Sequence, residues 1–311
     1  MAIDISATVG SLRLRSPLLL ASGTIGAKGD KLLAFSQVAG AVVTKSISRQ
    51  PHQGNPPPRI VRIDHDGVIN SEGGLNPGIE KFSQTLRQIK SGLRCPLIGS
   101  LSPRALRFDT ELENVADTFA ENGADGIELN FKYLYDEKEF RTDFSTKQIS
   151  EIMTRVRRVV QIPLIAKLAY GGMDTAILAK AAEDAGADAV SAINSVFPAM
   201  KIDIKKRAPV LSVKFGALSG APIRPLAVAA VYRIASAVKI PVIGIGGVMS
   251  GEDVLEFLLA GACAVQIYTV AMREGVEAFS RIQRELESYM EENGIESVKE
   301  VIGAAQGEVR P

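Results

Sequence analysis

Residues 241–270 read PVIGIGGVMSGEDVLEFLLAGACAVQIYTV, and this stretch decides the expected fold. It begins and ends with short apolar runs, which are typical of parallel strands buried on both faces. Between them, GEDVLEFLLAG (251–261) has apolar residues at the three- and four-residue spacing of an amphipathic helix. A strand, a helix and a second strand in this order predict one β-α-β unit of a parallel sheet.

The same pattern recurs along the chain, although the sequence itself does not repeat. Eight short segments are expected to be strands: LLLAS (18–22), GAVVTK (40–45), PLIGSL (96–101), GIELNF (126–131), PLIAKLA (163–169), AVSAIN (189–194), PVIGIGG (241–247) and AVQIYTV (264–270). Helical spacing occurs in 111–122, 145–160, 175–186, 226–238 and 251–261. Strands that alternate with helices over roughly 250 residues predict an α/β fold, the (β/α)8 TIM barrel. A doubly wound open sheet is the alternative, but no GxGxxG motif follows the first strand.

Two segments are longer than ordinary loops. Residues 46–79 are rich in proline and glycine, and residues 196–224 follow the sixth expected strand. Long insertions on a barrel usually carry function or a partner surface. No linker divides the chain, so residues 1–311 are expected to form a single barrel domain with these two insertions.

Composition excludes several classes of protein. The chain has 311 residues, a formal net charge of +1 and 46% hydrophobic residues, so neither nucleic acid nor a membrane surface is an expected partner. No apolar run reaches the roughly 18–20 residues that span a bilayer, and no signal peptide is recognisable. Cys95 and Cys263 lie in apolar segments, which favours a reducing compartment and a cytoplasmic location. His52 and His65 have no metal-ligand spacing, so no metal site is expected.

In a (β/α)8 barrel the chemistry lies at the carboxyl ends of the strands. Those positions should continue the apolar interior, but here they are polar or glycine. The residues are Ser22, Lys45, Ser100, Asn130, Lys167, Asn194, Ser195, Gly246, Gly247, Tyr268 and Thr269. Their concentration at one end of the expected barrel predicts a ligand site there.

Lys45 and Lys167 each end an apolar run, so each amine is expected to meet an anion or a polar ligand. The alternative is a buried stem whose amine extends to solvent. Gly246 and Gly247 precede an expected helix, and free N–H groups at such a position predict a phosphate site. The alternative is a helix cap without a ligand.

Asn130 and Asn194 can each donate and accept hydrogen bonds, which suits a planar ligand such as a pyrimidine or a flavin ring. The alternative is a pair of turn residues. Together the strand ends predict a phosphorylated, partly polar ligand held against two lysines. Flavin mononucleotide (FMN) fits, with a lysine to stabilise the negative charge that reduction adds. A phosphorylated sugar is the alternative.

Longer motifs extend over nearly the whole chain. They are SPLLLASGTIG (16–26), GAVVTKSIS (40–48), QGNPPPRIVR (53–62), GVINSEGGLNPG (67–78), GIELN (126–130), AGADAVSAINS (185–195), IDIKKRAPVLS (202–212), ALSG (217–220), the opening stretch to residue 269, and ENGIESVKEVIG (292–303). With these motifs the chain resembles the catalytic subunit of class 1 dihydroorotate dehydrogenases. The GNPPPR stretch is most similar to the 1B type, which works with an iron–sulfur/FAD electron-transfer subunit.

The resemblance implies an FMN barrel, as a homodimer, that oxidises dihydroorotate in pyrimidine biosynthesis. Hydride would leave substrate C6 for flavin N5 while a base removes the C5 proton. The implied FMN residues are Ser22, Lys45, Ser46, Ser100, Asn130, Lys167, Ile193, Gly220, Gly246, Gly247, Tyr268 and Thr269. The implied substrate residues are Asn70, Ser71, Glu72, Gly73, Gly74, Asn130, Asn194 and Ser195. Lys45 would contact both ligands and take part in catalysis.

The loop expected to supply the base departs from the family pattern. The family reads N-x-S-C-P-N and its cysteine is the base, whereas residues 130–135 read NFKYLY. Tyr133 therefore stands at the base position, and Tyr135 replaces a substrate-binding asparagine. A tyrosine with an unperturbed pKa of about 10 is a poor base at neutral pH, but Lys132 or Lys45 nearby would lower that pKa. The alternatives are Asp136, Glu137 or no proton transfer by this loop.

The pyrimidine loop also differs from the family. Glu72 and Gly74 replace apolar residues, and Ser100 stands where an asparagine usually contacts the flavin. The flavin half is therefore largely intact and the substrate half altered. This leaves three alternatives to dihydroorotate oxidation: a related dihydropyrimidine substrate, a flavin-binding protein without catalysis, or a lyase that forms a Schiff base through Lys45 or Lys167.

Overall fold

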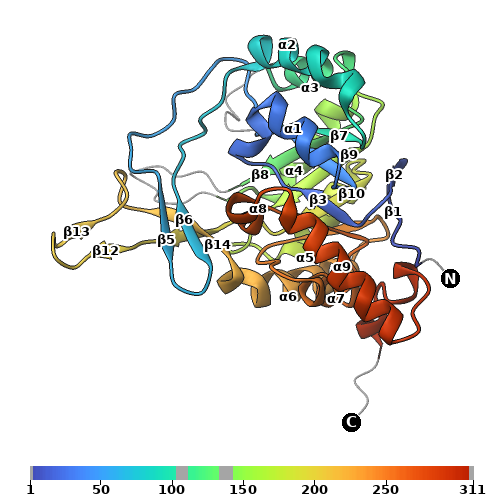
Figure 1. Cartoon of the computed structure of the whole chain (residues 1–311). Helices are drawn as coiled ribbons and strands as arrows, with labels where there is room; N and C mark the ends of the chain where they lie inside the picture. The colour runs from blue at the N-terminus through green and yellow to red at the C-terminus, as the bar shows by residue number, and fades with distance from the viewer. Residues whose placement is uncertain (1–2, 103–110, 133–142, 308–311) are drawn as a thin grey trace.

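A closed parallel barrel forms the centre of the molecule (Figure 1). The computed structural model describes residues 3–102, 111–132 and 143–307. The barrel strands are β3 (Leu18–Leu20), β4 (Ala41–Val43), β7 (Leu97–Leu101), β8 (Gly126–Phe131), β9 (Leu164–Leu168), β10 (Ala189–Ala192), β15 (Val242–Ile245) and β16 (Ala264–Ile267). Each neighbours the next in chain order, and β16 pairs with β3 to close the ring. The predicted (β/α)8 barrel and its strand segments are confirmed.

Helices surround the barrel (Figure 1). They are α1 (Gly29–Ser36), α2 (Ile79–Ile89), α3 (Glu111–Glu121), α4 (Thr146–Arg157), α5 (Thr175–Asp184), α6 (Arg224–Ala235), α7 (Gly251–Leu259), α8 (Thr269–Glu274) and α9 (Glu277–Glu292). Short 3-10 turns occur at Thr24–Ala27, Lys90–Gly92, Ala221–Ile223, Val298–Glu300 and Ala304–Gln306. The five helices expected from spacing are present as α3 to α7, whereas α1, α2, α8 and α9 were not predicted. Within the described ranges, every helix is too short or too polar to cross a bilayer.

The amino-terminal half of the barrel is an apolar core. Side chains alternate along each strand, so every second residue points inward. Leu19, Ile98, Ile165 and Ile243 form one buried cluster there. A hairpin of β1 (Ala7–Val9) and β2 (Leu12–Leu14) joins this cluster and closes the amino-terminal end of the barrel. The ligand site must therefore lie at the other end.

Glycines in two barrel strands let helices approach closely. A Cβ on Gly99 of β7 would lie 2.5 Å from the ring of Phe119 in α3. A Cβ on Gly244 of β15 would lie 2.4 Å from the ring of Phe257 in α7. Both rings are fully buried, so each fills the space that its glycine leaves.

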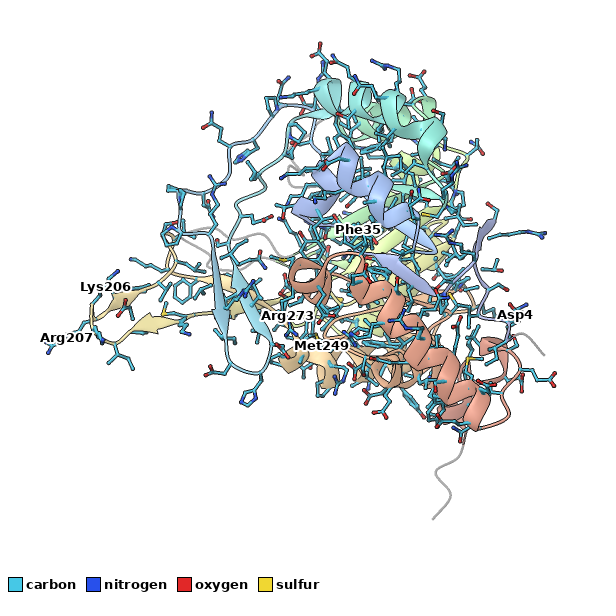
Figure 2. All side chains as sticks on the ribbon, in the orientation of Figure 1. Asp4, Phe35, Lys206, Arg207, Met249 and Arg273 are labelled. Carbon is cyan, nitrogen blue, oxygen red and sulfur yellow. The ribbon has the colours of Figure 1, made fainter. Side chains whose placement is uncertain are left out.

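The first and last helices of the barrel layer meet through another aromatic contact. Phe35 of α1, labelled in Figure 2, packs edge-on against Phe279 of α9 with the ring centroids 5.5 Å apart. Edge-to-face pairs at this separation are favourable beyond the apolar area that they bury. The contact joins segments that are far apart in the sequence and closes the helical layer where β16 meets β3.

The two insertions form one four-stranded antiparallel sheet and a separate two-stranded hairpin. The first holds β5 (Ile60–Ile63) and β6 (Gly67–Asn70), and the second holds β11 (Val196–Ala199), β12 (Ile202–Asp203), β13 (Ala208–Pro209) and β14 (Gly216–Gly220). The sheet order is β11-β14-β6-β5, so β6 and β14 join the insertions. Figure 1 shows this sheet to one side of the barrel, with the β12–β13 hairpin furthest out. Arg273 of α8, labelled in Figure 2, forms an ion pair with Asp66 and ties the sheet to the barrel.

Phe119→Ala tests the packing of α3 against the barrel. Because the ring is fully buried against Gly99, its removal leaves a cavity and should lower the free energy of unfolding by about 3–5 kcal/mol. Urea denaturation followed by circular dichroism measures the change. The exposed Tyr289→Ala is the control, with an expected change within about 0.5 kcal/mol. Equal effects of the two substitutions would contradict this account of the packing.

Candidate active site

A cavity of about 960 Å³ lies at the carboxyl ends of the barrel strands, beside the four-stranded sheet. This volume is at the upper end of the range for small-molecule sites, roughly 300–1,000 Å³. The predicted residues that line it are Ser22, Lys45, Ser46, Asn70, Ser71, Glu72, Gly73, Gly74, Asn130, Lys167, Ile193, Asn194, Ser195, Gly220, Gly246, Gly247, Tyr268 and Thr269. Apart from Ser100, the structure thus brings both predicted sets, from distant parts of the chain, around one space.

A buried polar cluster forms the floor of the cavity. Glu128 of β8 is fully buried, and its Oε1 lies 3.4 Å from Nζ of Lys167 in β9. Gln266 of β16 accepts a hydrogen bond from Lys167 at 3.3 Å and donates one to Glu128 at 2.5 Å. Ser191 of β10 also donates to Glu128, at 3.1 Å. Lys167 therefore meets its anion within the protein while its side chain still borders the cavity.

Hydroxyl and amide groups are linked along one wall. Asn194 donates to Oδ1 of Asn130, and Asn130 donates to Oγ of Ser46 at 3.0 Å. Ser46 is 2.9 Å from the hydroxyl of Ser100 and 3.4 Å from that of Ser22. Asn130 and Asn194 thus orient each other at the cavity surface. Ser100 is fully buried and is absent from the described lining, so it supports Ser46 from behind.

Lys45 lies between the barrel and the sheet. Its amine forms an ion pair with Glu72, the residue two positions beyond the end of β6. The two side chains are only 12% and 16% exposed, so water screens the pair weakly. Both strand-end lysines therefore have protein carboxylates as partners, which the sequence analysis did not foresee.

Three glycines present bare backbone to the cavity. Gly220, Gly246 and Gly247 have φ values of +90°, +126° and +81°, which side chains rarely adopt. A Cβ on Gly220 would lie 2.1 Å from the carbonyl oxygen of Asp66, and one on Gly247 would lie 2.6 Å from the Cβ of Arg224. These positions require glycine, and bare backbone of this kind can approach a phosphate closely.

The start of α7 corrects one part of the predicted phosphate site. Its N-cap, Ser250, accepts a hydrogen bond from the backbone of Asp253, and Asp253 accepts from the backbone N–H groups of Met249 and Ser250. Glu285 of α9 accepts from the N–H of Gly251 at 2.8 Å. Since the chain's own side chains satisfy this terminus, any phosphate contact would come from the glycines before it.

Tyr268 lines the cavity, but its hydroxyl is used within the protein. The hydroxyl is 2.9 Å from Oγ1 of Thr24 and accepts a hydrogen bond from the N–H of Ile25 at 3.2 Å. The ring covers Gly23, where a Cβ would lie 2.1 Å from it. Burial raises the pKa of Tyr268 above its ordinary value, so the phenol stays protonated at neutral pH. Its structural role is to hold the loop after β3.

The expected base cannot be placed, because Tyr133, Tyr135, Asp136 and Glu137 lie outside the described residues. The two cysteines of the chain lie at the other end of the barrel: Cys95 precedes β7 and Cys263 precedes β16. Burial raises the pKa of each thiol to about 12, which also removes the reactive thiolate. In the described part of the chain, no cluster of three His, Cys, Asp or Glu side chains could bind a metal ion.

Sequence reasoning missed several residues that build the site. Glu128 and Gln266 interrupt apolar strands in the same way as the lysines, so the rule applied to Lys167 could have found them. Asn55, in the proline-rich motif, donates to the carbonyl oxygen and the hydroxyl of Ser71 at 2.9 and 3.0 Å. No local signal predicts that contact, because it depends on how the first insertion folds back on itself.

Comparison with known proteins identifies the family. A family profile described as dihydroorotate dehydrogenase matches residues 5–290. The chain belongs to the dihydroorotate dehydrogenase family. Membership of the dihydroorotate dehydrogenase family implies a flavin cofactor.

Several relatives in the dihydroorotate dehydrogenase family match over nearly their whole length, and each is named dihydroorotate dehydrogenase B (NAD(+)), catalytic subunit. The protein from Pyrococcus abyssi is 41% identical over 301 residues, which is 94% of this chain and 96% of the relative. The protein from Methanothermobacter thermautotrophicus is 38% identical over 310 residues, covering 98% and 99%. The protein from Geobacter sp. (strain M21) is 38% identical over 308 residues, covering 97% and 98%.

Substitutions in the floor cluster should reveal the cost of an unpaired buried charge. Glu128→Gln leaves the ammonium of Lys167 without its anion and should lower the free energy of unfolding by about 3–5 kcal/mol. Replacing both residues by methionine removes both charges, so it should cost less than the single change. Urea denaturation of both variants tests this. A double variant less stable than Glu128→Gln would contradict the proposed pairing.

Proposed function

We propose that the chain is an FMN-dependent oxidoreductase that oxidises the CH–CH bond of a dihydropyrimidine, as the catalytic subunit of a dihydroorotate dehydrogenase. One observation carries the proposal: apart from Ser100, the residues expected for FMN and those expected for a pyrimidine line a single cavity. The names of the relatives give dihydroorotate as their substrate. Its oxidation is a step of pyrimidine biosynthesis.

The residues of the cavity fit FMN. Gly220, Gly246 and Gly247 would hold the phosphate through bare backbone, at positions where side chains are excluded. Asn130 and Lys167 would contact the ring, one through an amide and the other through a charge. The chemistry that FMN would supply is acceptance of a hydride from substrate C6. Lys167 would stabilise the negative charge that reduction adds to the ring.

The polar groups of the substrate half suit a pyrimidine ring. Asn70, Asn130 and Asn194 offer amides that both donate and accept, as the alternating C=O and N–H groups of the ring require. Ser195 adds a hydroxyl beside them. Lys45 would lie between the two ligands. This arrangement supports a substrate held by hydrogen bonds along its edge.

The dehydrogenation also needs a base to take the proton from substrate C5. We assign this role to Tyr133, since it stands at the base position of the family loop and neither cysteine can reach the site. The tyrosinate would accept the C5 proton as the C5–C6 double bond forms. Lys132, which borders the cavity at the end of β8, would favour the ionised form.

An electron-transfer partner is part of the proposal. The relatives are named as catalytic subunits of an NAD(+) enzyme, and the GNPPPR motif (54–59) resembles the 1B type. We therefore propose that an iron–sulfur/FAD subunit reoxidises the flavin. A homodimer and a cytoplasmic location remain predictions from the sequence.

The geometry argues against a Schiff-base lyase. Such an enzyme needs a neutral, accessible amine. Lys167 is 4% exposed and paired with Glu128, and Lys45 is paired with Glu72. Each amine is occupied by a protein carboxylate and is not presented free to a substrate carbonyl, which argues against attack by either lysine.

The direct test is anaerobic addition of a dihydropyrimidine to the FMN-loaded protein. Dihydroorotate is added first, then its analogues. We expect the flavin absorption to bleach, because hydride transfer reduces the ring. Dithionite gives the fully reduced reference spectrum. A flavin that dithionite bleaches and no dihydropyrimidine reduces would contradict the proposed function.

Tyr133→Phe tests the assigned base. The rate of flavin reduction should fall by about 10²–10⁴-fold, the usual contribution of a general base. In the wild type the rate should rise with pH, because only the ionised phenol accepts a proton, and this rise should disappear in the variant. Stopped-flow absorption at several pH values measures both. A variant with the wild-type rate and pH profile would exclude Tyr133 as the base.

A further inference from the structure

The charged pair of Lys45 and Glu72 bears on which dihydropyrimidines the site accepts, because it sets the charge that a substituent on the ring would meet. Glu72 lines the cavity, and its carboxylate meets the amine of Lys45 there. We propose that this pair selects an uncharged dihydropyrimidine, a cyclic ureide without a ring carboxylate. The inference rests on the proposed dehydrogenation and changes only the substituent on the ring.

The position of Glu72 is fixed by its own loop. Asn55 donates from its backbone N–H to the carbonyl oxygen of Glu72 at 3.2 Å and from its side chain to Ser71. The flanking Gly73 has φ of +66°, and a Cβ there would lie 2.5 Å from Asn55. Gly54 approaches so closely that a Cβ on it would lie 2.2 Å from the carbonyl oxygen of Glu72. The loop backbone therefore fixes Glu72 in the cavity wall, where its carboxylate pairs with Lys45.

The charge of Glu72 opposes an acidic substrate. A carboxylate on the ring would need a cation, and Lys45 already has an anion at hydrogen-bonding distance. An incoming carboxylate must either displace Glu72 or share the lysine with it, and two carboxylates at one weakly screened cation repel each other. Such built-in repulsion is a common source of specificity.

The same carboxylate favours an uncharged ring. An ionised glutamate only accepts hydrogen bonds, and a dihydropyrimidine carries N–H donors along its edge. Asn70 and Asn194, which line the same cavity, can serve the ring carbonyl groups. An uncharged ureide would satisfy Glu72 without disturbing its pairing with Lys45, so it would bind without loss of an ion pair.

Two other lysines line the described part of the cavity. Lys167 is held by Glu128 and Gln266 at the floor. Lys132 borders the cavity just after β8 and would attract an acidic ligand. The difference in affinity between uracil and orotate measures the sum of this attraction and the repulsion by Glu72.

Uracil and orotate form a matched pair of probes, since they differ only by the carboxylate. Calorimetric titration of the FMN-loaded full chain should give a Kd for uracil at least tenfold lower than that for orotate. Glu72→Met removes the repelling charge at similar size, so it should strengthen orotate binding at least tenfold and weaken uracil binding. Glu72→Gln keeps the size and polarity of the side chain but removes its charge, so it should also strengthen orotate binding.

A control variant and a second assay separate the possible failures. Asp64→Asn, in the exposed turn between β5 and β6, should leave both affinities unchanged. Tighter binding of orotate than of uracil by the wild type, or equal effects of the Glu72 and Asp64 variants, would overturn the inference. If dihydroorotate reduces the flavin faster than dihydrouracil, the inference fails and the proposed function stands. If neither compound reduces a flavin that dithionite reduces, both the proposed function and the inference fail.

Discussion

The charge pair between Glu128 and Lys167 inside the barrel is the constraint on which the site depends. A charge taken out of water must be compensated within the protein, and Gln266 and Ser191 both donate hydrogen bonds to Oε2 of Glu128. These four side chains separate the apolar core at the amino-terminal end of the barrel from the cavity at the carboxyl ends of the strands. Because they come from four different strands, their geometry follows from barrel closure, and Lys167 is presented to the cavity at a fixed height.

The second constraint is the pairing of β6 with β14. It converts two insertions, which are about 150 residues apart in the sequence, into one sheet beside the cavity. The loop after β6 then carries Glu72 to Lys45, which lies beyond the end of β4. The residues proposed for FMN therefore come mostly from barrel strand ends, and many of those proposed for the substrate come from the insertions.

The sequence predicted the barrel well because its strands are short, apolar and regularly spaced, as in AVVTK and LIAK. It also predicted which strand ends meet, since the carboxyl ends of parallel strands share one edge. It did not predict the partner of either lysine, because the contacts of Glu72 and Glu128 join separate strands and loops. The capped start of α7 and the inward use of the Tyr268 hydroxyl depend likewise on neighbours that local patterns do not specify.

The central claim is that this barrel end binds FMN over the paired Lys167. The most direct measurement is the titration of FMN into flavin-free protein, followed by quenching of flavin fluorescence, for the wild type and for Lys167→Met. The account predicts saturation at one FMN per chain, and weaker binding by a variant whose circular dichroism shows an intact fold. A folded wild-type chain that leaves flavin fluorescence unchanged and stays colourless with excess FMN would contradict it.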